Sequence, residues 1–264
     1  MRFLFIGDVV SKVGRQMILD NLKKIKEKYD IDIVIANGEN AAHGRGISLN
    51  SYNSLIDMGV NIITLGNHFN SCNKSNNFYV NATKLIRPLN IHPSAAGFGT
   101  RVFDYNNINF RVTNILGRVF INALNPQNPF DVLDELLPKC KEKIHIIDFH
   151  GEATGEKMAF AWNFDGKVSA ILGTHTHVQT TDNRILPNGT AYISDVGMTG
   201  PYDGIIGAKK EEIIFKTRTG LPAKFDVETG RGQFNAVVLD IDNETGKALS
   251  IKRVYISPDY IEGI

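Results

Sequence analysis

The chain has 264 residues and nearly balanced charge, with 29 Lys and Arg residues against 28 Asp and Glu residues. A net charge of +1 provides no overall field that would draw the protein onto nucleic acid or an anionic membrane, so an anionic ligand must be held by local groups. Hydrophobic content of 42% is ordinary for a globular protein, and the apolar runs are far shorter than the roughly 20 residues of a membrane span. We therefore expect a cytoplasmic protein with no membrane segment, no disulfide and two free cysteines.

The first quarter of the chain alternates strand and helix patterns. Continuous apolar runs, which are typical of buried parallel strands, lie at residues 2–7, 31–36 and 61–65. Helical spacing of apolar residues predicts helices over 11–29 and 48–58. This β-α-β-α-β order predicts parallel strands with right-handed crossovers, so the carboxyl ends of the three strands meet at one edge of a sheet.

The rest of the chain continues with strands and helices. A second β-α-β unit is predicted by a buried strand at 144–149, a helix over 152–162 and a strand at 167–172. The other predicted elements are a helix over 76–85, a hairpin of 100–105 and 108–116, a short helix after Asn128, a strand at 190–193, a glycine-rich loop at 195–204, and antiparallel strands at 234–241 and 249–256. No linker or internal repeat divides the chain, so we expect a single α/β domain over residues 1–264.

Five predicted strands end in side chains that can bind metal, and these are Asp8, Glu39, Asn40, Asn67, His68, His150, His175 and His177. His175 and His177 lie two apart, so both would point to one face if the backbone stays extended. A lone His-x-His is more often two polar residues at a strand end, but five such ends favour a metal site. Imidazole, carboxylate and amide ligands without thiolate suit iron, manganese or zinc. A two-metal centre needs a bridging carboxylate, for which Glu39 is the candidate.

The motifs in these positions resemble those of the calcineurin-like metallophosphoesterases. They are Gly7-Asp8, Gly66-Asn67-His68, His150 and Gly173-Thr174-His175-Thr176-His177, in that order. Longer stretches, at 5–10, 36–42, 63–68, 148–150, 173–180 and 195–203, are similar to the bacterial YmdB-like family of 2′,3′-cyclic-nucleotide 2′-phosphodiesterases. This resemblance spans nearly the whole chain. It implies a metallophosphoesterase-like α/β/β/α sandwich, in which two mainly parallel or mixed sheets are flanked by helices.

Three differences distinguish the chain from these patterns. Val10 stands where the wider superfamily has a second ligand histidine, and Glu39 with Asn40 replaces the usual aspartate. The YmdB-like branch shares both changes. After Asn67-His68, however, the branch has Thr-Trp-Asp where this chain has Phe69-Asn70-Ser71. This last difference leaves the expected metal ligands intact and bears on the fit of the substrate.

The resemblance also implies roles for individual residues. One metal ion would be bound by Asp8, Glu39, Asn40 and His177, and the other by Glu39, Asn67, His150 and His175. The two ions would be iron or manganese, with zinc as the alternative. A metal-bound hydroxide would attack phosphorus while His68 protonates the leaving ribose oxygen, and an orienting role for His68 is the less favoured alternative. Candidate substrate contacts, for which surface or packing roles are equally compatible, are Arg45, Arg118, Asp195 and Tyr202.

The favoured function is hydrolysis of cyclic nucleotides, the 2′,3′-cyclic before the 3′,5′-cyclic compounds, or of an RNA-derived phosphodiester. A phosphomonoesterase is an alternative, because two-metal chemistry does not by itself separate monoesters from diesters. A non-catalytic protein that binds nucleotide, RNA or a regulatory partner is the other alternative. The complete set of candidate ligands favours an enzyme, and the sequence leaves a homo-oligomer open.

Overall fold

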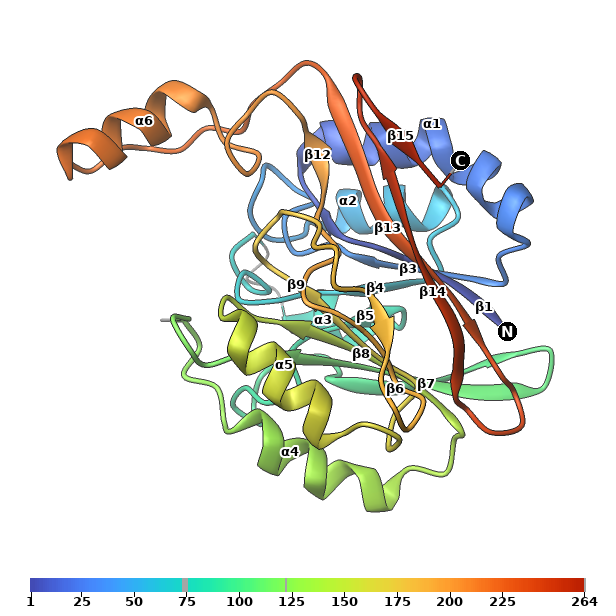
Figure 1. Ribbon diagram of the computed structural model, residues 1–264. Coiled ribbons are helices and arrows are strands. Elements are labelled where there is room, and N and C mark those ends of the chain that lie inside the picture. The colour runs from blue at the N-terminus through green and yellow to red at the C-terminus, as the bar shows by residue number, and fades with distance from the viewer. Residues whose placement is uncertain (73–75, 122, 264) are drawn as a thin grey trace.

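The structure is a computed structural model that describes residues 1–72, 76–121 and 123–263, and its centre consists of two β-sheets lying between layers of helices (Figure 1). The first sheet has the order β15 (Ile261–Glu262), β14 (Ala248–Ile256), β13 (Gly232–Ile241), β1 (Arg2–Ile6), β3 (Ile33–Asn37), β4 (Ile62–Thr64) and β5 (Leu85–Ile86). Beside it, β12 (Met198–Pro201) pairs with both β13 and β2 (Asp8–Val9). The second sheet has the order β10 (Arg184–Ile185), β11 (Ala191–Ile193), β9 (Ala170–Thr174), β8 (Ile144–His150), β7 (Ile108–Leu116) and β6 (Thr100–Tyr105).

Most of the helices cover the outer faces of the two sheets. The helices are α1 (Ser11–Tyr29), α2 (Leu49–Asp57), α3 (Asn76–Asn81), α4 (Pro129–Leu136), α5 (Thr154–Asn163) and α6 (Lys210–Thr219), with a 3₁₀ turn, η1 (Leu137–Lys139), after α4. In Figure 1, α1 and α2 lie on the side of the first sheet and α4 and α5 on the side of the second. This arrangement confirms the α/β/β/α sandwich expected from the sequence.

Strand β1 shows why its sequence is apolar without interruption. Successive side chains of a strand point to opposite faces. Phe3 and Phe5 belong to the buried cluster between the two sheets, where the rings of Phe3 and Phe110 meet edge to face with centroids 5.3 Å apart. Leu4 and Ile6 belong to the cluster beneath α1 and α2. Because both faces are covered, residues 3–6 of the strand are all buried and only Arg2 at its start is exposed, so the apolar run shows no polar alternation.

The chain differs from the sequence-based expectation in several places, including residues 76–86, residues 198–201 and helix α6. The helix expected over 76–85 ends at Asn81, because Leu85 and Ile86 instead pair in parallel with β4 as strand β5. Within the expected glycine-rich loop, residues 198–201 form β12, whose pairing partners are distant in sequence. Helix α6 was not predicted, since it buries no residue and projects away from the rest of the molecule (Figure 1). Long-range pairing, which local sequence patterns do not report, decides the first two cases.

The topology brings two sets of carboxyl ends together. Strands β1, β3 and β4 are parallel neighbours in the first sheet, and β8 and β9 are parallel neighbours in the second. The residues that follow these strands carry most of the predicted metal ligands. Two simpler expectations are also met, because Cys72 and Cys140 are both free. Among residues 1–72, 76–121 and 123–263, no helix has the length and apolar character needed to cross a membrane.

His145 in β8 provides a test of this core. Its Nε2 lies 2.8 Å from Thr113 Oγ1, and burial, helped by nearby Arg111, lowers its pKa from 6.5 to about 3. As the pH falls below about 6.5, the unfolded chain gains a proton on this histidine that the folded chain does not, so stability falls with pH. Between pH 7 and pH 5, we expect the wild type to lose about 2 kcal/mol more free energy of unfolding than His145→Gln. Urea denaturation of both proteins measures this difference, and equal losses would contradict the assignment.

Candidate metal centre

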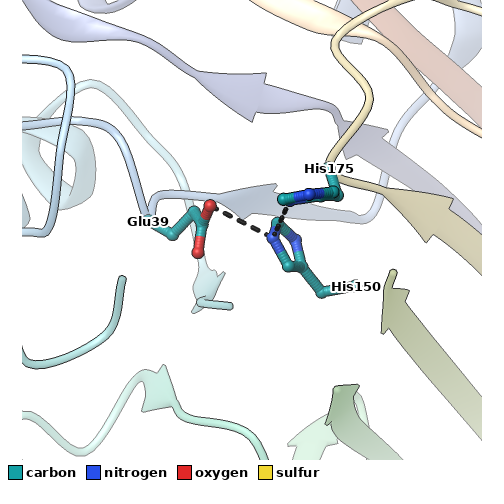
Figure 2. Close-up of side chains that lie close together, drawn as sticks. All are labelled: Glu39, His150 and His175. Atoms are coloured by element: carbon teal, nitrogen blue, oxygen red, sulfur yellow. Dashed lines mark hydrogen bonds and ion pairs between the residues drawn. The ribbon is translucent and has the colours of Figure 1, made fainter. Parts of the chain in front are cut away.

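Three candidate ligands surround a fourth, His150, which is the last residue of β8. Its Nε2 lies 3.0 Å from Asn67 Oδ1, 3.0 Å from His175 Nδ1 and 3.1 Å from Glu39 Oε1. Figure 2 shows Glu39, His150 and His175 pointing toward one another from three separate segments. One ligand atom from each of these three residues lies within 4.8 Å of the others, which is close enough to hold a metal ion. Gly66 permits this approach, since a side chain there would collide with Glu39 and His150.

The orientation of His150 is fixed from behind. Its Nδ1 lies 2.9 Å from Thr174 Oγ1, and the Thr174 hydroxyl donates to Asp148 Oδ1 at 2.7 Å. The other Asp148 oxygen accepts from Thr64 at 2.5 Å and from Asn37 at 2.9 Å. Because the Thr174 proton is used toward Asp148, Nδ1 of His150 donates to Thr174 and Nε2 faces the other ligands. Such an outer hydrogen bond commonly sets the tautomer of a metal-binding histidine.

The electrostatics of the cluster require a positive charge. Burial opposes ionisation of His150, but the carboxylates of Glu39 and Asp8 outweigh it and raise the pKa of His150 to about 9. Burial likewise favours a neutral Glu39, yet His150 and His68 lower the pKa of that carboxyl to about 2. Buried carboxylates are stable only with a cationic partner. A proton on His150 can fill this role, and so can a metal ion.

A second group of donors lies next to the first. Asp8 is fully buried, and its Oδ1 has no hydrogen-bond partner among the described residues. His177 Nε2 lies 3.8 Å from this oxygen and 3.2 Å from Asn40 Nδ2, and turning the Asn40 amide over presents its oxygen instead. Asn40 Nδ2 also lies 3.3 Å from Glu39 Oε1. Glu39 therefore faces both groups of donors, and the unpaired Asp8 oxygen fits a metal ligand.

Both histidines that follow β9 have their second ring nitrogen bound elsewhere. His177 Nδ1 lies 2.8 Å from the carbonyl oxygen of Ile206, which leaves Nε2 free to face Asp8. His175 Nε2 lies 3.1 Å from Glu152 Oε2, which leaves Nδ1 free to face His150. Glu152 was not predicted from the sequence, although it follows the ligand His150 by two residues. The two histidines would thus bind metal through different nitrogens.

The backbone around these histidines is not extended, which corrects the sequence argument. Strand β9 ends at Thr174, and His175 and His177 have φ values of 105° and 67°, in the left-handed region that non-glycine residues seldom adopt. Hydrogen bonds hold this loop in place. The His175 N–H donates to Asp8 Oδ2 at 3.0 Å, and the Thr176 N–H donates to an oxygen of Asp195 at 2.9 Å. The imidazoles converge because the loop is bent, not because the strand continues.

A buried ion pair supports the bent loop from below. Lys157 of α5 is 1% exposed and donates to Asp195 Oδ2 at 2.9 Å and to the Thr174 carbonyl at 3.0 Å. Asp195 is equally buried, which does not fit its expected contact with substrate. The sequence contained a signal for Lys157, because it lies three and four residues before the buried Phe160 and Ala161 on the same face of α5.

The other candidate residues lie in different surroundings. His68 donates its backbone N–H to Glu39 Oε2 at 3.0 Å, and its side chain lines a cleft of about 480 Å³ together with Arg45 and His177. Burial lowers the pKa of His68, and nearby Arg45 adds to this effect. Away from this cleft, the Arg118 backbone donates to Glu156 and the Tyr202 hydroxyl donates to Asp259. For Arg118 and Tyr202, a contact with substrate stays a prediction.

The stretch that departs from the family pattern lies beside His68. Phe69 is buried, and its ring packs edge to face with that of Tyr79, with centroids 5.6 Å apart. Asn70, in contrast, is exposed. The first of the three changed residues therefore serves packing against Tyr79, whereas the second lies on the surface.

Comparison with known proteins places the chain in a family. A sequence profile of the YmdB-like protein family matches residues 4–254. The chain belongs to the YmdB-like family. A YmdB-like relative from Bacillus subtilis, named 2′,3′-cyclic-nucleotide 2′-phosphodiesterase, is 46% identical over 263 residues, which are 99% of each chain. The resemblance to this family that the sequence motifs indicated is confirmed.

Solved structures agree with this assignment. A crystal structure described as a novel phosphatase of Mycoplasma pneumoniae is 42% identical and superposes with a TM-score of 0.94, over 97% of this chain and 93% of that one. The NAD nucleotidase of Haemophilus influenzae is 13% identical with a TM-score of 0.57, over 97% of this chain and 56% of that one. This last likeness concerns the fold alone. The YmdB-like chain thus has named relatives that are phosphodiesterases or phosphatases.

Replacing Glu39 tests the centre directly. Glu39→Gln keeps the side-chain size but removes a charge that faces both donor groups, so we expect metal content after dialysis to fall by at least half. Elemental analysis after metal loading measures this change. The melting temperature should show that the fold persists, and Glu27→Gln on the exposed face of α1 is the matched control. Unchanged metal content in Glu39→Gln would rule out Glu39 as a ligand.

Proposed function

We propose that this chain is a 2′,3′-cyclic-nucleotide 2′-phosphodiesterase that works with two metal ions, iron or manganese before zinc. The observation that carries the proposal is the pair of donor groups on either side of Glu39. One group contains Asp8, Asn40 and His177, and the other contains Asn67, His150 and His175. The activity named for the Bacillus subtilis relative supplies the substrate class.

In the proposed reaction, water adds across the bond between phosphorus and the 2′ oxygen. A new P–O bond forms, the P–O2′ bond breaks, and the 2′ oxygen takes up a proton to leave a nucleoside 3′-phosphate. Two bound metal ions would activate the water and stabilise charge on the phosphoryl oxygens. The protein's own donor groups hold the site in shape, and Arg45 in the cleft is available to a phosphoryl oxygen.

His68 is our candidate for the proton donor. It lines the cleft, and it belongs to neither donor group. Its backbone bond to Glu39 keeps the imidazole beside the centre. A bound anionic diester would favour the protonated imidazole and so act against the effect of burial. His68 can then deliver a proton to the leaving 2′ oxygen, a role that suits a side chain titrating near neutrality.

Hydrolysis of phosphomonoesters is the second candidate function, because the Mycoplasma pneumoniae relative is described as a phosphatase. Both reactions can use the same pair of donor groups. They differ in the leaving group and in the charge on the substrate. A comparison of substrates therefore separates them.

A substrate panel tests the proposal. We expect manganese- or iron-loaded protein to hydrolyse 2′,3′-cyclic AMP to the 3′-phosphate with a kcat/KM at least about 100 times that for 3′,5′-cyclic AMP or for 3′-AMP as a monoester. The product is identified by chromatography, and metal content is measured on the same preparation. A higher kcat/KM for the monoester 3′-AMP would favour the second candidate function, phosphomonoester hydrolysis. A loaded protein that turns over none of the three would contradict both enzyme proposals.

Replacing His68 tests its role. His68→Ala should retain its metal but lose on the order of 10²–10⁴-fold in kcat on 2′,3′-cyclic AMP, the usual contribution of a general acid. A bis-nitrophenyl diester, whose leaving group needs little protonation, should suffer much less. Exposed His92→Ala serves as the control. Equal losses on both substrates, or a loss of metal, would show that His68 has another role.

A further inference from the structure

The cleft beside the metal centre adjoins a second, larger hollow. The cleft has a volume of about 480 Å³, and the second hollow, which we call the α1 groove, has a volume of about 780 Å³. The α1 groove lies between the amino-terminal half of α1, from Ser11 to Asp20, and the segment from Phe225 to Gly232. His43, Phe225, Asp226 and Val227 line both hollows, so the α1 groove and the cleft share this stretch of wall, and the α1 groove lies on the side away from His68 and His177.

The α1 groove is larger than the proposed reaction needs. A site for a drug-sized ligand occupies roughly 300–1,000 Å³, a range that the cleft already meets. A single cyclic mononucleotide therefore leaves the α1 groove free. A ligand that extends beyond the reacting phosphate would use it.

The chemistry of the α1 groove suits a nucleobase. Val13, Met17 and Val227 provide apolar contacts, and Gln16 and Thr229 provide hydrogen-bonding groups. Carboxylates in the lining outnumber the one lysine, which disfavours a polyanion along its whole length. A nucleobase is flat and neutral and has hydrogen-bonding groups along its edges. Any of the bases can stack on an aromatic ring, because each has a flat aromatic face.

Phe225 offers such a ring at the junction of the two hollows. Its side chain is 44% exposed although it is large and apolar. Lys216 Nζ lies 4.8 Å from the centre of the ring. Two cations, Arg45 and Lys224, line the cleft side of the junction, where a phosphate linking two nucleosides would pass. The charges thus lie where the linking phosphate would be, and the apolar contacts lie where the base would be.

We propose that the α1 groove binds the nucleoside on the 5′ side of a nucleotide that carries a terminal 2′,3′-cyclic phosphate, and that the base of this preceding nucleoside stacks on Phe225. The preferred substrate class is then the cyclic-phosphate end of short RNA fragments, and free cyclic mononucleotides occupy only the cleft. This inference rests on the proposed function and extends it. The chemical step is unchanged, because only the 2′ ester of the terminal phosphate is hydrolysed.

The test compares 2′,3′-cyclic AMP with the dinucleotide ApA that ends in a 2′,3′-cyclic phosphate. We expect the wild type to have a kcat/KM at least about 5-fold higher for the dinucleotide, mostly through KM, which is the lower end of what one stacked base contributes. Phe225→Ala and Met17→Ala should bring this ratio toward one. Leu19→Ala, which changes an exposed residue of α1 outside the groove lining, should keep the wild-type ratio.

Binding of the products gives an independent readout. Calorimetry should show that the wild type binds ApA 3′-phosphate more tightly than 3′-AMP, and that Phe225→Ala removes most of this difference. The inference would be overturned if the wild type hydrolysed the dinucleotide and 2′,3′-cyclic AMP with nearly equal kcat/KM. It would also be overturned if Phe225→Ala and Met17→Ala both kept the wild-type ratio of these two values. Either result would leave the proposed function intact. The inference would also be overturned if the wild type formed a dimer that Phe225→Ala dissociates and showed no preference for the dinucleotide. In that case a second copy of the chain, not a nucleoside, occupies the α1 groove. Failure to hydrolyse either compound would reject the proposed function and this inference with it.

Discussion

The structure around the candidate metal centre depends on two buried carboxylates, Asp8 and Glu39, whose negative charge must be compensated. Each has one oxygen held by a backbone N–H, from His175 in the case of Asp8 and from His68 in the case of Glu39. The other oxygen of each faces the donor groups. Negative charge in a buried site is unfavourable unless a cation compensates it. The fold therefore fixes the carboxylates firmly while leaving one oxygen of each available to a positive partner.

Around these carboxylates lies a layer of buried hydrogen bonds that orients the ligands. Asp148 holds the Thr174 hydroxyl and so sets the tautomer of His150, while the Lys157–Asp195 pair holds the bent loop that carries His175 and His177. Buried polar groups of this kind cost free energy unless all their partners are in place. Asp148, Thr174, Lys157 and Asp195 each have hydrogen-bond partners here, so the positions of the ligands they support are determined by several contacts.

The open side of the centre is connected to the protruding part of the chain. The carbonyl of Ile206 binds His177, and the segment that leads back from α6 supplies Lys224 and Phe225 to the wall of the cleft. The segment before α6 thus contacts a metal-ligand candidate, and the segment after α6 shapes the space where a substrate would lie. A change that moves α6 can therefore affect both metal binding and substrate fit.

The sequence by itself determined most of the longer strands and the set of candidate ligands, because buried parallel strands give continuous apolar runs and their carboxyl ends stand out as polar residues. The sandwich fold was implied by the resemblance of its motifs to those of the metallophosphoesterases. It did not determine β5 or β12, which form by pairing with strands that are distant in sequence. Nor did it determine α6, which has no buried face and so no apolar pattern that would mark it as a helix. Nor did it determine how His175 and His177 reach the site, since their bent backbone is held by Asp8 and Asp195 from other strand ends. The spacing of Lys157 from Phe160 and Ala161 indicates a buried position, but its bond to the Thr174 carbonyl depends on how α5 packs against that loop. Local patterns report the burial of each segment, whereas the meeting of the two sheet edges is a property of the tertiary structure alone.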